Sequence, residues 1–121
     1  MIIDSVDALE VWCRATAEGV RREAPDLSAR QMAVLLTVYL RPPPHTVRGL
    51  AQTMHISKPA VSRALDRLCK LELVRRKKDE ADKRNILVTR TVRGSIFLRE
   101  YGEIISAAAT EAESARQNPE I

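Results

Sequence analysis

The sequence has 121 residues and a formal net charge of +4, with no low-complexity segment. That length suits one domain with its own hydrophobic core, and two cysteines are too few for a disulfide framework. The absence of a secretory leader and of an apolar run near 18 residues argues against a secreted or membrane-spanning protein, so we expect a reduced, cytoplasmic setting.

The first predicted helix covers residues 4–24 and carries an apolar stripe with Trp12 beside it. The stripe contains Val6, Leu9, Cys13, Thr16, Ala17 and Val20. Ser28 and Gln31 then form a capping box for a second helix that extends to Leu40. Because this second helix is apolar on nearly every side, we expect it to be the most buried element. Pro42 to Pro44 should form a stiff linker after it.

Two short helical patterns follow, separated by a break at residues 55–57. The first has apolar residues at helical spacing from Val47 to Met54. The second begins with Ser57 as a plausible N-cap and Pro59 in its first turn, where a missing N–H is harmless. Its apolar face contains Val61, Ala64, Leu65 and Leu68, and its other face contains Lys58, Ser62, Arg63, Arg67 and Lys70.

A hairpin pattern comes next. Strand-like runs at residues 73–76 and 86–89 flank a charged tip at residues 77–85. Together, the two helices and the hairpin predict a winged helix-turn-helix, in which the second helix enters the DNA major groove. Thr91 can cap a last helix that extends to about residue 116. Its apolar stripe contains Phe97, Tyr101, Ile104, Ile105 and Ala108 and fades into Ala112 and Ala115.

The basic charge is concentrated in this central region. Residues 46–90 hold 12 Lys or Arg against 5 Asp or Glu, whereas residues 1–45 and 91–121 each have a small acidic excess. This distribution indicates phosphate contacts by the helix-turn-helix and the wing. The alternative is a solvated charged face that binds nothing.

The order of parts resembles the MarR family of bacterial transcription regulators from about residue 28 to 100. The resemblance is carried by Leu50-Ala51, by Ile-Ser-Lys-Pro-Ala-Val-Ser-Arg at residues 56–63, by Leu65, Leu68, Leu73 and Val74, and by Asp82-Lys83-Arg84 followed by Val88, Thr91 and Gly94. It departs at Arg90, where the family usually has an aliphatic residue. We also expect no counterpart of the family's last helix after Ile121.

The resemblance implies a mainly α fold with a small β-wing, as a single MarR-like domain over residues 1–121. Its winged helix-turn-helix core would cover residues 28–91, and helices at 4–24 and 92–117 would form a two-fold dimer. The expected interface residues are Leu9, Trp12, Cys13, Val20, Phe97, Tyr101, Ile104 and Ile105. The alternative is that the terminal helices fold back onto their own domain.

The expected DNA-binding residues are Ser57, Lys58, Pro59, Ser62, Arg63, Arg67, Lys83 and Arg84. Arg63 is our candidate for a base contact, because a bidentate arginine–guanine pair is the commonest specific contact. The serines, Lys58 and Arg67 would hold phosphates. Arg84 resembles the family's minor-groove arginine, braced by Asp82, and the alternative for it is a solvated hairpin tip. We expect Asp66 to orient an arginine.

Enzyme signals are weak. His45 and His55 lie ten residues apart without further ligands at useful spacing, so we expect no metal site, no cofactor and no catalytic role. Cys69 is expected in the core. Cys13 lies on the apolar stripe, where a small buried hydrophobe fits, although a peroxide-sensing thiol in the first helix is the alternative.

The function that this pattern favours is sequence-specific binding of double-stranded DNA at a palindromic operator. The resemblance adds a homodimeric repressor that covers a promoter and is relieved by a small-molecule effector. The alternative from another class is a protein-interaction module that uses the winged helix as a docking surface. Salt dependence of duplex binding would separate the two, because a DNA-binding protein releases counterions.

Overall fold

The computed structural model describes residues 4–114, which form two compact units, one of residues 27–98 and one of the terminal segments up to residue 26 and from residue 99. Five helices and three strands are described. In chain order they are α1 (Ser5–Arg21), α2 (Ala29–Leu40), β1 (His45–Thr46), α3 (Val47–Met54), α4 (Lys58–Lys70), β2 (Val74–Lys78), β3 (Ile86–Arg90) and α5 (Val92–Ser114).

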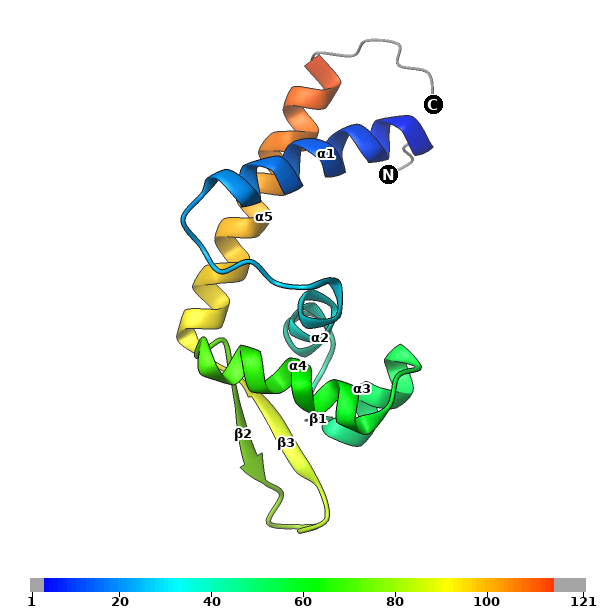
Figure 1. Cartoon of the computed structure of the whole chain (residues 1–121), viewed down its shortest axis with the longest axis vertical. Coiled ribbons are helices and arrows are strands. Elements are labelled where there is room, and N and C mark those ends of the chain that lie inside the picture. Colours follow the sequence, from blue (N-terminus) through cyan, green and yellow to red (C-terminus); the bar gives the residue numbers. More distant parts are fainter. Residues whose placement is uncertain (1–3, 115–121) are drawn as a thin grey trace. The chain divides into compact units, whose positions relative to one another are not determined.

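The unit of residues 27–98, here called the winged-helix unit, combines three helices with a three-stranded antiparallel sheet. The strand order is β1-β3-β2, and β2 and β3 form a long hairpin in which Arg76 lies opposite Val88. α4 packs against α2, α3 and β2, and the hairpin projects from this cluster (Figure 1). The prediction of a mainly α fold with a β-wing is therefore confirmed.

Local capping explains where the helices of this unit begin. Ser28 and Gln31 form the predicted capping box of α2, and the side chain of Ser57 accepts a hydrogen bond from the Ala60 N–H at the start of α4. α3 begins at Thr46, which caps Gly49, and ends at His55 with a φ of 55°. Histidine is among the few residues enriched in this left-handed region, so the turn between α3 and α4 needs no glycine.

The core of the winged-helix unit centres on α4. Five α4 residues are buried, namely Ala60, Val61, Ala64, Leu65 and Leu68, against three in α2, namely Val34, Leu35 and Val38. The prediction that α2 is the most buried element is therefore wrong for the single chain. Leu36 and Leu40 are 37% and 66% exposed, because only one side of α2 meets α4 and β3.

Tyr39 joins the end of α2 to the wing and to the start of α5. Its hydroxyl donates to the Leu73 carbonyl at 2.7 Å and accepts from the Thr91 N–H at 2.8 Å. Thr91 caps α5 as predicted, accepting from the Gly94 N–H at 2.9 Å. A Cβ at position 94 would collide with the Tyr39 hydroxyl and the Leu73 carbonyl, which explains the glycine in this Thr-x-x-Gly sequence.

Arg90, the departure from the family pattern, also acts at the end of α2. Its Nε donates to the Val38 carbonyl at 3.0 Å and its Nη2 to the Arg41 carbonyl at 3.1 Å. The guanidinium also lies 5.7 Å from the centre of the Tyr39 ring. Arg90 thus satisfies carbonyls that the last turn of a helix leaves without intrahelical partners, at the negative end of the helix dipole.

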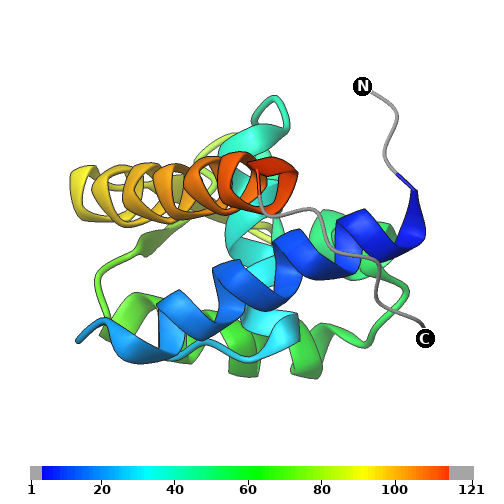
Figure 2. The same cartoon turned by 90° about the horizontal axis from the view of Figure 1, so that it is seen from above.

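The second unit, here called the terminal unit, consists of α1 and the part of α5 that follows residue 98. Two ion pairs join these segments, Arg14 with Glu111 at 3.5 Å and Arg22 with Glu100 at 3.6 Å. α5 is one uninterrupted helix (Figure 2). None of the helices within residues 4–114 has the length and hydrophobicity that a membrane span requires.

Several predicted boundaries shift. α1 ends at Arg21 instead of residue 24, and β2 and β3 each extend beyond the predicted run. The short strand β1 was not predicted, because the prolines before it indicated only a linker. It pairs with β3 through His45 opposite Val88. The predicted end of the last helix, with Ala115 and residue 116, lies outside the described residues.

Candidate nucleic-acid interface

The outer face of α4 is basic and exposed, because its inner face is fixed in the core. Val61, Leu65 and Leu68 are completely buried. Most of the predicted DNA-binding residues of α4 lie on the other side. Ser57, Lys58, Pro59, Arg63 and Arg67 are exposed, and Ser62 is half-buried. The packing of the helix therefore decides which side chains a ligand can reach.

The cations on this face have no partners within the part of the chain that the structure describes. Lys58, Arg63 and Arg67 make no hydrogen bond or ion pair among residues 4–114, whereas Arg76 and Arg84 are both bonded to carboxylates. An arginine without an internal partner keeps all five N–H donors for an external acceptor. The face can thus receive phosphate oxygens or base edges without breaking an existing contact.

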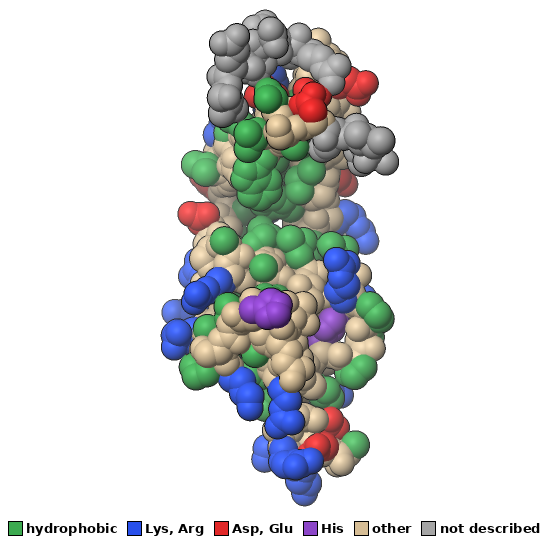
Figure 3. Space-filling view, turned by 90° about the vertical axis from the view of Figure 1, so that its right-hand side faces the viewer, with side chains coloured by type: hydrophobic (Ala, Val, Ile, Leu, Met, Phe, Trp, Pro, Cys, Tyr) green, Lys and Arg blue, Asp and Glu red, His purple; other side chains and the backbone are tan. Residues whose placement is uncertain are grey.

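The wing carries a second basic site at its tip. Arg84 Nε donates to Asp82 Oδ1 at 3.0 Å and Nη2 donates to Oδ2 at 3.1 Å, while the Arg84 N–H also donates to Oδ1. These bonds are the bracing predicted for Asp82. Arg84 remains 82% exposed, and the neighbouring Lys83 is exposed as well. Figure 3 shows Lys and Arg side chains gathered toward the tip of the hairpin, with acidic side chains among them.

The electrostatics of the tip follow from the same pair. Side-chain and backbone hydrogen bonds from Arg84 hold the pKa of the Asp82 carboxyl below its usual value, and the positive charge of Arg48 acts in the same direction. The bond to Asp82 also raises the pKa of the Arg84 guanidinium. Both groups therefore stay ionised, and the bond stays charge-assisted, at neutral pH.

Asp66 binds an arginine, as predicted. Its Oδ1 accepts from Arg76 Nη2 at 2.8 Å, and the same nitrogen donates to the Ser62 carbonyl at 2.7 Å. Arg76 belongs to β2, so this contact links the wing directly to α4.

Three further basic residues of this surface were not predicted from the sequence. Arg48 is exposed in the first turn of α3, and its positive charge contributes to lowering the pKa of Asp82. Arg75 and Lys77 are exposed at alternate positions of β2. The run of basic residues that follows Val74 in β2 was the available signal. The missing one was β1, which brings the start of α3 beside β3.

The two histidines have local structural roles. The Nε2 of His45 lies 3.1 Å from the Arg41 carbonyl, so this nitrogen must carry the proton that it donates. His55 is the exposed left-handed residue that ends α3. Within residues 4–114, His, Cys, Asp and Glu side chains form no group of three that could bind a metal ion.

The residues expected in a dimer interface have different surroundings in the single chain. Leu9, Trp12 and Val20 are 49%, 56% and 79% exposed, and Ile105 is 39% exposed. Tyr101 and Ile104 are half-buried, whereas Phe97 is only 7% exposed and is part of the core of the single chain.

The cysteines correct our expectations. Cys13 is exposed, so the prediction that it is a buried hydrophobe is wrong for the single chain. Ala15, two residues along α1, is the buried small residue. Cys69 is only partly buried, and this burial raises the pKa of its thiol.

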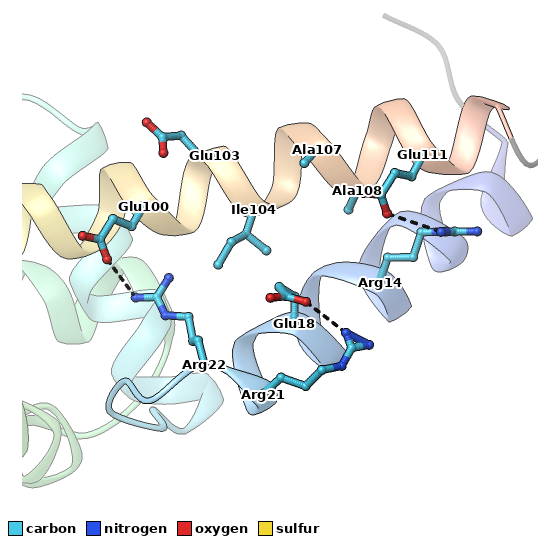
Figure 4. A pocket seen from close by; sticks show the side chains of 10 residues that line it. All are labelled: Arg14, Glu18, Arg21, Arg22, Glu100, Glu103, Ile104, Ala107, Ala108 and Glu111. Atoms are coloured by element: carbon cyan, nitrogen blue, oxygen red, sulfur yellow. Dashed lines mark hydrogen bonds and ion pairs between the residues drawn. The ribbon is translucent and has the colours of Figure 1, made fainter.

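A pocket of about 670 Å³ lies between α1 and α5 within the terminal unit (Figure 4). Ile104, Ala107 and Ala108 form its apolar part. Its three arginines are paired, Arg14 with Glu111, Arg21 with Glu18 and Arg22 with Glu100. The cations of this pocket are thus already neutralised, in contrast to those on α4.

Known proteins resemble this chain both in sequence pattern and in fold. The model of the MarR family matches residues 26–85, whereas a comparison with curated proteins found no match. Among solved structures, a mutant of MepR from S. aureus has a TM-score of 0.75 at 20% sequence identity, over 93% of this chain and 80% of that chain. The transcriptional regulator BldR from Sulfolobus solfataricus has a TM-score of 0.62 at 23% identity, over 96% and 89%.

A third similar structure is described as reduced AbfR bound to DNA. It has a TM-score of 0.62 at 24% identity, over 84% of this chain and 68% of that chain. At these identities the likeness is one of fold. It extends across both the winged-helix unit and the terminal helices.

Proposed function

We propose that the chain is a MarR-family transcription regulator, and that it is a homodimeric repressor that binds a palindromic operator in double-stranded DNA. The match of the family model to residues 26–85 supports the family. The observation that carries the proposal is the set of unpaired cations on the outer face of α4. Lys58, Arg63 and Arg67 have no partner within residues 4–114, on a helix whose opposite face is fully buried.

Roles can be assigned along this surface. Arg63 projects from the second turn of α4, so it would meet base edges in the major groove, where N-terminal residues of a recognition helix make contact. Lys58 and Arg67 would hold phosphates on either side. Ser57 already accepts the Ala60 N–H, so only its hydroxyl hydrogen remains to be donated to a phosphate oxygen.

The wing would contact the neighbouring minor groove. The narrow minor groove concentrates negative potential and attracts inserted arginines. Asp82 fixes the position of the Arg84 guanidinium through two of its nitrogens. Lys83 would add a phosphate contact beside it.

The dimer is proposed from the exposed apolar residues of the terminal unit. Leu9, Trp12 and Val20 lie exposed along α1, and apolar surface of this kind is stabilised by covering it. A two-fold dimer would present two α4 helices to two half-sites. The family supports the remaining step, in which the bound dimer covers a promoter in the cytoplasm and a small ligand releases it by changing the spacing of the two α4 helices.

Selection of binding sites from a random duplex pool, at two salt concentrations, tests this assignment. Arg63→Ala should lose about 1–3 kcal/mol and relax the preference at one base pair per half-site. Arg84→Ala should weaken binding to most sequences and reduce the salt slope by about one unit per lost contact. If Arg84→Ala rewrites the selected motif while Arg63→Ala weakens all sequences equally, the two roles are reversed. A protein that binds no duplex at low salt would be a docking module instead.

A second candidate, a thiol response, is favoured by the exposure of Cys13 in the single chain, and it requires that the dimer leaves this thiol accessible. Solvent access is one condition for oxidation of a cysteine by peroxide. Brief peroxide treatment should then release DNA from the wild type and leave Cys13→Ser bound. Equal retention of DNA by both proteins would exclude this candidate.

A further inference from the structure

One contact joins the outer strand of the wing to the recognition helix. β2 is an edge strand that pairs only with β3 in the sheet. On its side facing α4, Arg76 Nη2 donates to the Ser62 carbonyl at 2.7 Å and to Asp66 Oδ1 at 2.8 Å. The Arg76 side chain is 30% exposed and the Asp66 side chain 67%.

The contact lies next to the exposed arginines of α4. Ser62 and Asp66 lie one helical turn apart, and each directly precedes one of the unpaired arginines, Arg63 and Arg67. Arg76 therefore binds α4 at the edge of its exposed basic face, and it neutralises the charge of Asp66 there. Arg76 uses Nη2 for both contacts with α4, and because it is paired with Asp66 it is not one of the unpaired cations.

We propose that Arg76 and Asp66 are positioning residues for DNA recognition. They hold β2, and with it the wing, at a fixed angle to α4, so that α4 and Arg84 reach neighbouring grooves of one duplex together. This inference rests on the proposed function. Neither residue needs to touch DNA for the effect.

In Asp66→Asn, electrostatics predicts a change in affinity for every duplex, whereas positioning predicts a change in the preference for the operator. Removing a negative charge beside the phosphates strengthens sequence-independent attraction, so affinity for any duplex should rise. Asparagine retains an acceptor oxygen but loses the negative charge, so the bond to Arg76 is no longer charge-assisted and the wing is held less firmly. The preference for the selected operator over a scrambled duplex should therefore fall. We expect this preference to fall about tenfold, the equivalent of one charge-assisted hydrogen bond, while affinity for the scrambled duplex stays equal or rises.

The experiment measures fluorescence anisotropy with an operator selected by the wild type and with a scrambled duplex of equal length and composition. The variants are Asp66→Asn, Arg76→Gln, Arg76→Lys and the double variant Asp66→Asn/Arg76→Gln. Because Asp66 acts only through Arg76, the double variant should lose no more preference than Arg76→Gln alone. Arg76→Lys should restore part of the preference, since an ammonium can donate to only some of the same acceptors.

Arg93→Gln is the matched control. It breaks another exposed ion pair, Arg93 with Glu72 at 3.0 Å, which does not involve α4 or the wing hairpin. Its preference should equal that of the wild type. Urea unfolding of all variants checks the fold, and little change is expected because exposed ion pairs contribute little to stability.

A measurement without DNA tests whether the Arg76 contact holds β2 against α4. Amide hydrogen exchange of Val74–Lys78 should quicken in Arg76→Gln and remain unchanged in Arg93→Gln. An unchanged preference in Asp66→Asn, with both duplexes bound more tightly, would overturn the positioning role and leave the proposed function intact. A wild type without any preference for a selected duplex would overturn both.

Discussion

The winged-helix unit and the terminal unit differ in how far their large apolar side chains are buried. The first encloses Leu35, Leu50 and Leu65 almost completely, whereas the buried core of the second, within the described residues, consists of Ala15 and Ala108. Leu9, Trp12 and Val20 of α1 remain exposed. A helix is stabilised in water mainly by burying its apolar stripe. The comparison therefore separates a unit with a core of large side chains from a unit whose large apolar side chains on α1 stay exposed in one chain.

The largest expected effect concerns this exposed surface. Leu9→Asp would place an unpaired charge in the proposed dimer interface, at a cost of several kcal/mol. Sedimentation velocity at micromolar concentration should show a wild-type dimer and a folded Leu9→Asp monomer. Ile86→Asp is the control, because Ile86 is similarly exposed at 44% but belongs to the wing. A monomeric wild type would show that the exposed stripe serves another purpose.

Two glycines of α5 give the next comparison. Gly94→Ala forces a methyl group against the Tyr39 hydroxyl and the Leu73 carbonyl, and we expect a loss of about 1–3 kcal/mol in the free energy of unfolding. Gly102 has open space around its Cα, so Gly102→Ala should gain up to about 1 kcal/mol through helix propensity. Urea unfolding measures both. Equal effects of the two substitutions would contradict the tight junction at Tyr39.

Cysteine reactivity should also differ between the units. Burial raises the pKa of the Cys69 thiol, which keeps the reactive thiolate scarce, whereas Cys13 is exposed. In the monomeric Leu9→Asp variant, Cys13 should react with a maleimide severalfold faster than Cys69, as followed by mass spectrometry. The wild type should protect Cys13 if the interface covers it. Faster modification of Cys69 in the variant would contradict the exposures described above.

The smallest expected effect is at the wing tip. Because Arg84 lowers the pKa of Asp82 in the folded state, their bond contributes above the ordinary carboxyl pKa and is lost as pH falls through the lowered value. In a carboxyl-detected NMR titration, Arg84→Ala should move the Asp82 midpoint upward toward its ordinary value. Arg48→Ala should move it less, since Arg48 acts only through its charge. An unmoved midpoint in Arg84→Ala would contradict the bond.

Much of the winged-helix unit could be predicted because its signals are local. Ser57 and Pro59 mark the start of α4, Ser28 and Gln31 mark that of α2, and the Asp82–Arg84 bond spans two residues. Such features depend on neighbours in sequence, so periodicity and capping rules suffice.

The failures concern contacts between distant residues. β1 has only two residues and exists because His45 and Thr46 meet β3, some 40 positions later. Similarly, helical spacing placed Cys13 on an apolar stripe without revealing which part of that stripe faces α5. Ala15 and Ala108 are buried instead, because small residues allow close packing. The bond between Asp66 and an arginine was expected, but its partner Arg76 on β2 was not identifiable from spacing.

Arg90 has a consequence for how the molecule unfolds. An aliphatic residue at this position could loosen gradually, since dispersion contacts fade without breaking. The guanidinium instead bonds two carbonyls at the end of α2 from the last residue of β3. We therefore expect fraying of α2 and separation of the base of the wing to occur as a single cooperative event. The end of a helix and the end of a strand, whose bonded residues are 49 positions apart in the sequence, would then belong to the same foldon.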